Sequence, residues 1–280
     1  MGKIKILISL FATLAAITFI DLVKAGSVTL STLTSKVQEA IESRSAIGSV
    51  TGIDETMEDG ENNYVVVFTR DGVERTLTFS EDGKVIRTQT FETNLPPVVR
   101  RIISAEFTDI KPVRFYRVTE DEDPYYDLAI PGGNATNSLR VSENGRWWSL
   151  DVELADVPAP VRTTIERELG AGEYDSISKT KVEGTLYYEA DDTAKDGHDI
   201  NLNIATDGKL IFREDEVTLA QVTSAAQKTI NTQFKADQID SITKHSENGD
   251  VTFEVEAHRN GKTIEMSVGH GGRIRQQTAH

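Results

Sequence analysis

The sequence contains no cysteine, and only 7% of its 280 residues are aromatic. The lack of cysteine excludes disulfide bonds, thiolate nucleophiles, cysteine-ligated zinc and iron–sulfur clusters. Basic residues are also scarce, because 30 Lys and Arg stand against 45 Asp and Glu, which gives a formal net charge of −15. Nucleic acids are bound through clusters of Lys and Arg, so this balance argues against a nucleic-acid partner.

Catalytic and metal-binding motifs are missing as well. The five histidines form no H-E-x-x-H pair, and neither a G-x-S-x-G nucleophile motif nor a G-x-x-x-x-G-K phosphate loop occurs. We therefore expect no cofactor. A weak calcium candidate remains, because carboxylates on a glycine-containing loop can bind Ca²⁺. A solvated turn is the favoured interpretation of this cluster, which consists of Asp191, Asp192, Asp196 and Asp199.

Long apolar runs are limited to the N-terminus. Residues 6–20 are apolar apart from Ser and Thr, and they follow Lys3 and Lys5. This order, with Val23-Lys24-Ala25 before the cleavage point, is typical of a secretory signal peptide. The run is shorter than the roughly 20 residues of a membrane-spanning helix. We expect residues 1–25 to be a signal peptide and the protein to be exported, to a periplasm or the exterior; a retained membrane anchor is the alternative.

A turn motif recurs along the rest of the chain. The first copy is Ser80-Glu-Asp-Gly83-Lys84, followed by two apolar residues. Asp-Gly and Asn-Gly between apolar runs form hairpin turns, because both residues tolerate positive φ. Related turns follow at intervals of 62, 63 and 64 residues, so that the shared glycines are Gly83, Gly145, Gly208 and Gly272.

Strand and helix patterns precede each turn. Two strand-like apolar runs lie directly upstream, such as residues 64–68 and 73–79 in the first copy. Further upstream, apolar residues recur every four positions and so form one stripe of a helix. These stripes are Leu33, Val37 and Ile41; Leu95, Val99 and Ile103; Val157, Val161 and Ile165; and Val222, Ala226 and Ile230.

Each unit therefore consists of a helix and three or four antiparallel strands, in about 62 residues. We expect four tandem units, at residues 28–90, 91–152, 153–215 and 216–280. One such unit buries too little surface to be stable alone, so the units are expected to pair into two domains, 26–152 and 153–280. The predicted fold class is α+β, with helices on one face of an antiparallel sheet.

The order of helix, Tyr-x-Val strand, second strand and Asp-Gly-Lys turn resembles the PepSY-like repeat. Its tandem form is similar to the β-lactamase-inhibitor-protein-like (BLIP-like) fold. The first unit matches best, and the resemblance covers nearly all of the chain after the signal peptide. It implies an exported protein that acts by protein contact, as an inhibitor or as the pro-segment of a secreted peptidase, and it implies no catalytic residues. The fourth unit departs from the pattern at Gly269-His-Gly-Gly272 and Arg275, so we expect its last hairpin to be an exposed edge.

Three aromatic doublets are the candidate partner-binding residues. Successive strand residues point to opposite faces, so one ring of each doublet packs under the helix and the other points away from it. An outward aromatic side chain is a typical anchor for a protein or sugar partner. The alternative is that both faces are buried. The doublets are Tyr125 and Tyr126, Trp147 and Trp148, and Tyr187 and Tyr188.

These observations favour a non-enzymatic, exported binding or inhibitory module. It would act by protein contact through the sheet face that carries the aromatic rings, and its partner would be another exported protein or peptide. Two alternatives are an exported hydrolase with an acidic cleft between the domains, and an envelope structural or accessory subunit. The second alternative would involve the membrane if the N-terminal segment were retained as an anchor.

Overall fold

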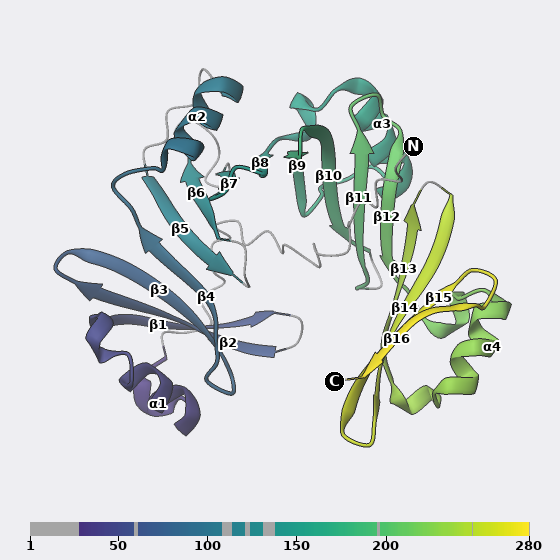
Figure 1. Cartoon of the computed structure of the whole chain (residues 1–280), viewed down its shortest axis with the longest axis horizontal. Coiled ribbons are helices and arrows are strands. Elements are labelled where there is room, and N and C mark those ends of the chain that lie inside the picture. Colours follow the sequence, from purple (N-terminus) through teal and green to yellow (C-terminus); the bar gives the residue numbers. More distant parts are fainter. Residues whose placement is uncertain are drawn as a thin grey trace. The chain divides into compact units, whose positions relative to one another are not determined.

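The computed structural model describes residues 28–58, 61–107, 114–120, 124–130, 138–194, 197–247 and 249–279. The expected signal peptide lies outside these residues. In the described part of the chain, no helix is long and apolar enough to cross a lipid bilayer. The fold is α+β: a helix followed by four strands occurs four times in the order of elements, and the paired strands are antiparallel (Figure 1).

The chain divides into two compact units, Met1–Gly145 and Arg146–His280. Within the first unit, each strand pairs with the next strand in sequence, from β1 to β7. Its elements are α1 (Ser35–Glu42), β1 (Ser49–Glu58), β2 (Glu61–Arg70), β3 (Val73–Ser80), β4 (Val85–Phe91), α2 (Pro97–Glu106), β5 (Arg114–Glu120), β6 (Tyr125–Ala129) and β7 (Ser138–Ser142).

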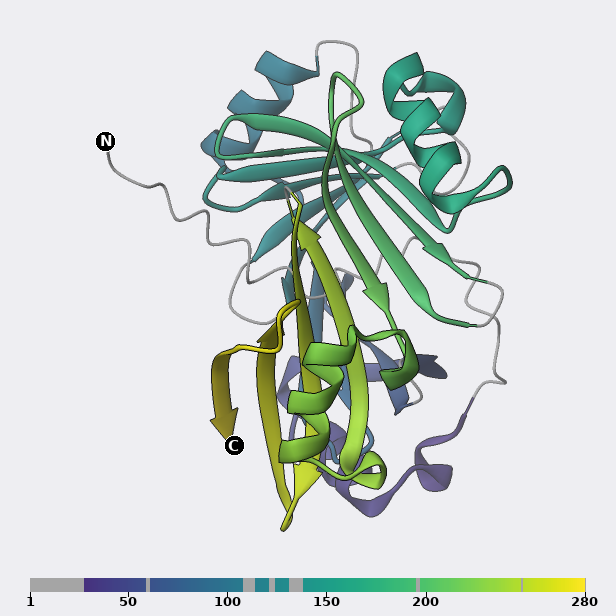
Figure 2. The ribbon, with the colours of Figure 1, turned by 90° about the vertical axis from the view of Figure 1, so that its right-hand side faces the viewer.

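The second unit follows the same rule from β8 to β16. Figure 2 shows its last helix, α4, lying against the final strands. Its elements are β8 (Trp147–Asp151), α3 (Ala159–Leu169), β9 (Ser176–Val182), β10 (Thr185–Thr193), β11 (Asp199–Ala205), β12 (Leu210–Glu216), α4 (Ser224–Gln233), β13 (Ile239–Glu247), β14 (Asp250–Arg259), β15 (Lys262–Gly269) and β16 (Ile274–Ala279).

The helices form where the apolar stripes predicted them. Val37 and Ile41 of α1 are 0% and 2% exposed, and the corresponding residues of α2, α3 and α4 are also buried. Pro96 and Pro158 precede the first helical residue of α2 and α3, where a missing N–H costs nothing. The helix residues form separate clusters with the strands that follow them, for example Ile165 with Leu202 and Ile204 in the second unit.

The turn glycines have the positive φ that the sequence predicts. Gly83, Gly145, Gly208 and Gly272 have φ between 76° and 88°. Steric reasons also require glycine at Gly208, because a Cβ there would lie 2.6 Å from the carbonyl oxygen of Pro160 in α3. The hairpin turn is therefore pressed against the first turn of its helix.

Two features differ from or extend the sequence expectation. Every helix is followed by four strands, and the opening ones, β1, β5, β9 and β13, belong to no run that we identified. The compact units meet at Gly145 and Arg146, because β8 pairs with β9 of the second unit. As expected, the last hairpin ends at a sheet edge, since β16 pairs with β15 and its residues 274–277 are exposed.

Candidate functional site

The six candidate aromatic residues do alternate between the two faces of their strands. Tyr188 and Tyr126 pair with the core residues Ile204 and Val141, which places them on the helix side. Tyr187 and Tyr125 therefore point to the other side. Five of the six side chains are nevertheless buried, and Tyr187 is half-buried. Their exposed fractions are 3% for Tyr125, 5% for Tyr126, 7% for Trp147, 5% for Trp148 and 6% for Tyr188.

These five rings are therefore buried on both faces of their strands, as in the alternative arrangement considered from the sequence. Tyr125 is held on its buried face by polar contacts: Arg87 donates to its hydroxyl at 3.3 Å, and the hydroxyl donates to Glu120 at 3.4 Å. On the helix side, the ammonium group of Lys179 lies 6.0 Å from the centre of a Trp148 ring. Contact between these rings and a partner stays a prediction, and it would require the rings to become exposed.

In the second unit, most acidic strand residues lie on one face of the sheet, whereas Asp192 and Asp215 lie on the other face with the basic residues. The strand register places acidic residues of β10–β15 on the side away from α3 and α4, because each is adjacent in sequence to a residue that packs toward the helices. We call this side the acidic face. It carries Glu189, Asp191, Asp199, Glu214, Glu216, Glu247, Asp250, Glu254, Glu256 and Glu265.

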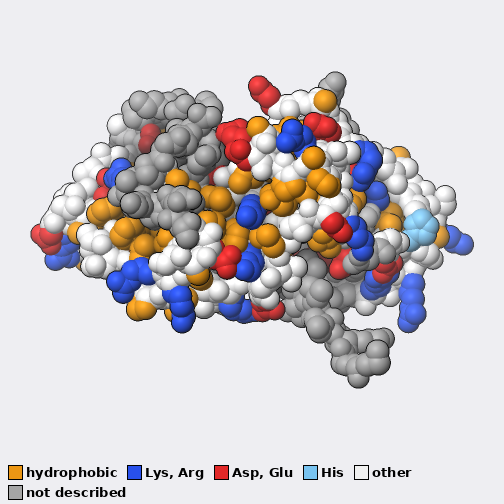
Figure 3. Space-filling view, turned by 90° about the horizontal axis from the view of Figure 1, so that it is seen from above, with side chains coloured by type: hydrophobic (Ala, Val, Ile, Leu, Met, Phe, Trp, Pro, Cys, Tyr) orange, Lys and Arg blue, Asp and Glu red, His pale blue; other side chains and the backbone are white. Residues whose placement is uncertain are grey.

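The basic residues of the same strands lie on the other side. All Lys and Arg residues of β9–β15 share a face with core residues such as Tyr188, Leu202 and Phe253. They are Lys179, Lys181, Arg213, Lys244, Arg259 and Lys262. The molecular surface seen from above in Figure 3 carries positive and negative side chains side by side. The uneven charge therefore concerns the two faces of the sheet in the second unit, and not that outer surface.

Two carboxyl groups of the acidic face are crowded by polar neighbours. Glu189 accepts hydrogen bonds from the hydroxyls of Thr180 at 2.9 Å and Ser178 at 3.1 Å. Asp191 accepts one from Ser176 at 2.6 Å and another from the amide of Asn201. Burial nevertheless raises the pKa of both carboxyls, because the lost hydration outweighs these hydrogen bonds.

The centre of the acidic face also carries an imidazole and an aromatic ring. His245 lies between Glu214, 3.4 Å away, and Glu254, 3.9 Å away, measured from ring nitrogen to carboxyl oxygen. The Phe212 ring packs edge-to-face on His245 at a centroid distance of 5.6 Å. Glu254 is 56% exposed, so this part of the face is open to a partner.

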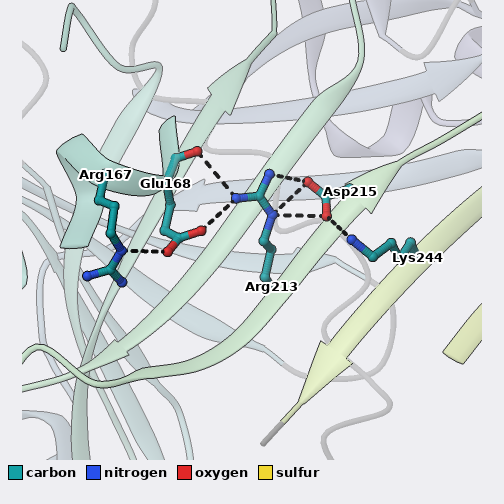
Figure 4. A network of polar contacts seen from close by, with 5 residues as sticks. All are labelled: Arg167, Glu168, Arg213, Asp215 and Lys244. Atoms are coloured by element: carbon teal, nitrogen blue, oxygen red, sulfur yellow. Dashed lines mark hydrogen bonds and ion pairs between the residues drawn. The ribbon is translucent and has the colours of Figure 1, made fainter. Parts of the chain in front are cut away.

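A polar network occupies the helix side, where β12 meets β13 (Figure 4). Arg213 donates to Asp215 through Nε at 2.8 Å and through Nη2 at 2.6 Å, and its Nη1 donates to Glu168 of α3 at 2.9 Å. Lys244 of β13 reaches the same Asp215 at 3.5 Å, and Arg167 pairs with Glu168 at 2.9 Å. The network ties the end of α3 to two neighbouring strands.

A hollow of about 450 Å³ lies beside this network. Arg213, Asp215 and Lys244 form its charged wall, and Ile200 and Val217 belong to its apolar wall. A second hollow of about 630 Å³ lies by the turn before β16, and His270 lines both.

Where the structure describes them, the carboxylates of the calcium candidate do not come together around one point. Asp191 and Asp192 lie on opposite faces of β10, Asp199 accepts from Thr193 at 3.1 Å, and Asp196 lies outside the described residues. Among the described residues, no group of three or more His, Asp or Glu side chains could hold a metal ion.

One histidine has the hydrogen-bonding pattern of a general base. Nδ1 of His258 contacts the Asp240 carboxylate, and its Nε2 lies 3.1 Å from the hydroxyl of Thr263. His258 and Asp240 are 57% and 44% exposed, and neither residue lines either of the hollows described above. These contacts alone do not define an active site, which also requires a positioned nucleophile and a place that orients the substrate.

Comparison with known families supports the fold. A family model described as "Putative beta-lactamase-inhibitor-like, PepSY-like" matches residues 125–212 and residues 187–275. The two matches together run from 125 to 275, which is more than half of the 280-residue chain. The chain belongs to the PepSY-like family. The first segment of this PepSY-like protein, where the sequence motif is clearest, lies outside the matched residues.

Solved structures that match part of this chain include several from Bacteroides species. They include a protein of B. eggerthii named among "putative periplasmic proteins" (14% identity, TM-score 0.35, 44% of this chain and 88% of that one). A DUF2874 family protein of B. uniformis has 15% identity and a TM-score of 0.34 over the same shares. A BLIP-like protein of B. fragilis has 14% identity and a TM-score of 0.33 over 44% of this chain and 85% of that one. Among curated proteins, no sequence matches this chain.

The acidic face was not predicted from the sequence, although a signal for it was present. Acids alternate with small or apolar residues in Glu189-Ala-Asp191 and in Glu254-Val-Glu256. Period-two alternation places such acids on one side of a strand. The basic residues on the other side could be assigned only once the register of each strand was known.

Proposed function

We propose that this PepSY-like protein is a non-enzymatic binding module that holds a basic partner protein against the acidic face of its second unit. The observation that carries the proposal is the uneven charge of β9–β15: one face carries ten acids and no Lys or Arg, and every Lys and Arg lies on the other face together with Asp192 and Asp215. Complementary charge steers a partner and fixes its orientation. Phe212 and His245 supply apolar contact area in the middle of this face.

The family supports a function through protein contact. Its model is described as inhibitor-like, and a solved neighbour is named BLIP-like. We extend that description to this chain as a proposal, with an exported protein or peptide as the partner. The aromatic doublets belong to the same proposal, and Tyr187 is the one of the six that keeps partial exposure beside Glu189.

Three further points complete the proposal. We infer that residues 1–25 direct export to a periplasm or the exterior. The four helix-plus-strand segments are copies of one repeat, because they share helix stripes, turn glycines and element order. Neighbouring copies pair into two domains, each with its helices on one face of the sheet.

The proposal is tested by affinity capture from the envelope fraction of the source cells. The test variant combines Glu254→Gln, Glu256→Gln and Glu265→Gln, which removes three charges from the acidic face. The matched control combines Asp156→Asn, Glu166→Gln and Asp237→Asn, three exposed acids that lie elsewhere. We expect the control to capture the same basic protein as wild type, and the test variant to lose it.

Salt provides a second measurement. Binding of the captured protein should weaken steeply with ionic strength in the wild type and less steeply in the test variant, because exposed charges are screened beyond about 8–10 Å. Equal capture by both variants, or a captured protein without a basic surface, would contradict the proposal.

A further inference from the structure

In the part of the chain that the structure describes, Lys244 of the second unit has a single, long ion pair. In the network of Figure 4, Arg167, Arg213 and Lys244 pair with two carboxylates, Glu168 and Asp215. Arg213 takes both oxygens of Asp215 at 2.9 Å or less, and Glu168 holds its third nitrogen. Asp215 is therefore committed to Arg213 before Lys244 approaches it.

Lys244 makes the longest contact of this network. Its contact with Asp215 is 3.5 Å long, and among the described residues this is the one polar contact of its ammonium group. An ammonium group can donate three hydrogen bonds. The side chain is 33% exposed, so it is partly removed from water without an equivalent partner.

The hollow beside Lys244 has apolar walls. Ile200, Val217 and Val251 line it and are each partly exposed, while Phe253 behind them is buried. Its volume of about 450 Å³ is in the range of small-ligand sites, which are mostly apolar with a few placed polar groups.

We propose that this hollow binds a monovalent carboxylate attached to a small apolar group. The carboxylate pairs with Lys244, and the apolar group lies against Ile200 and Val217. A monoanion fits better than a phosphate, because Asp215 and Glu216 also line the hollow and would repel a second negative charge. The site lies on the helix side of the sheet and goes beyond the proposed contact on the acidic face.

Two sources offer this chemistry: a free carboxylic acid and the C-terminal residue of a peptide. The probes are therefore 4-methylpentanoate and N-acetyl-leucine, and N-acetyl-leucinamide is the uncharged control. Binding to the full chain is followed by calorimetry and by backbone amide chemical shifts. We expect both carboxylates to shift amides around residues 198–217 and 244–253, with the tighter probe identifying the source.

Matched variants test the role of the ammonium group. Lys244→Met keeps the length of the side chain and removes its charge, and should weaken carboxylate binding at least tenfold. Lys228→Met, on the exposed side of α4, should leave it unchanged. Val217→Ser should weaken both leucine-like probes but not acetate, and melting curves establish that each variant is folded.

The proposal is overturned if N-acetyl-leucinamide binds as tightly as N-acetyl-leucine, or if Lys244→Met binds both carboxylates like the wild type. Absence of binding at tens of millimolar would overturn it as well. None of these outcomes depends on the acidic face, because no partner protein is present in the experiment.

Discussion

The hydroxyl of Thr164, in α3, donates a 2.6 Å hydrogen bond to the carbonyl oxygen of Gly208, in the turn between β11 and β12. Thr229 of α4 makes the same 2.6 Å bond to Gly272, in the turn between β15 and β16. In the first unit, the methyl group of Ala40 lies 3.4 Å from the Cβ position of Gly83. The first unit also joins helix and turn by a hydrogen bond, because the hydroxyl of Thr34, the N-cap of α1, donates to the carbonyl oxygen of Glu81 at 3.2 Å. The helix-to-turn contact is thus shared by the two units.

The hydrogen bond predicts a measurable stability difference. Thr164 is 2% exposed, so Thr164→Val would leave the Gly208 carbonyl without this donor in a dry contact. We expect a loss of about 1–3 kcal/mol in the free energy of unfolding by urea. Thr163→Val is the control, because Thr163 is exposed and bonds to its own helix at Ala159. A Thr164→Val protein as stable as the Thr163→Val protein would show that the hydrogen bond from Thr164 to Gly208 does not stabilise the fold.

Gly208 allows steric contact to be separated from backbone strain. A Cβ at Gly208 would lie 2.6 Å from the Pro160 carbonyl oxygen, whereas a Cβ at Gly184, which has nearly the same φ, would touch nothing within 4 Å. Gly184→Ala should cost about 1–2 kcal/mol through the left-handed conformation alone. Gly208→Ala should cost about 1–3 kcal/mol more, because helix and turn must move apart. Equal melting temperatures for the two variants would refute this prediction.

Arg213 should stabilise the fold far more than an exposed arginine. It is 22% exposed and satisfies Asp215 and Glu168, whose side chains are 11% and 21% exposed. Arg213→Met would leave Asp215 with only the 3.5 Å contact of Lys244 and Glu168 with only the exposed Arg167, and we expect a loss of about 3 kcal/mol. Arg146→Met is the matched control, since Arg146 and Glu183 are 67% and 64% exposed and such pairs contribute less than about 1 kcal/mol. Chemical denaturation measures the free energy of unfolding of both variants. Equal losses would contradict a stabilising role for the Arg213 network.

The carboxyls of the acidic face predict a pH dependence. Burial raises the pKa of Glu189 and Asp191, so both bind protons more tightly in the folded state than in the unfolded chain. Stability should therefore fall as the pH rises from the ordinary carboxyl range, about 4, through the raised folded values. Glu189→Gln combined with Asp191→Asn should flatten this slope in urea titrations at several pH values. The exposed Glu166→Gln should not flatten it, and an unchanged slope in the double variant would exclude these two groups.

Local patterns of the chain predicted its helices and turns well, because those depend on few residues. Gly83 and Gly208 occupy turns that need positive φ, and the apolar stripes of α1 to α4 require only a period of four. The opening strands were harder. Strand β9 reads Ser176-Ile-Ser-Lys-Thr-Lys-Val182, in which polar residues occupy both faces. On one face, the hydroxyls of β9 donate hydrogen bonds to Glu189 of β10. On the other face, Lys179 lies near the ring of Trp148 in β8. Both polar positions are therefore explained by contacts with other strands, which the local sequence does not reveal.

The aromatic doublets show the same limit. Alternation along a strand correctly placed Tyr187 and Tyr188 on opposite faces, but burial depends on what packs against each face. The uneven charge of the second unit has the same origin. Arg213 and Glu214 are neighbours in sequence, and only the pairing of Arg213 with Leu202 and of Glu214 with Asn201 shows which side each one occupies.

Within each unit, every strand pairs with the strand that precedes or follows it in sequence. Pairing two strands that are adjacent in sequence closes only a short loop, so the loss of conformational entropy is small. Chains whose contacts are mostly local also fold quickly. A chain of this kind can begin to form structure before its C-terminal half is available, since the first core cluster consists only of residues from the segment of α1 and β1 to β4. A protein that emerges from a ribosome or a pore N-terminus first can therefore assemble one segment at a time. Little apolar surface then stays exposed while the rest of the chain is still to come.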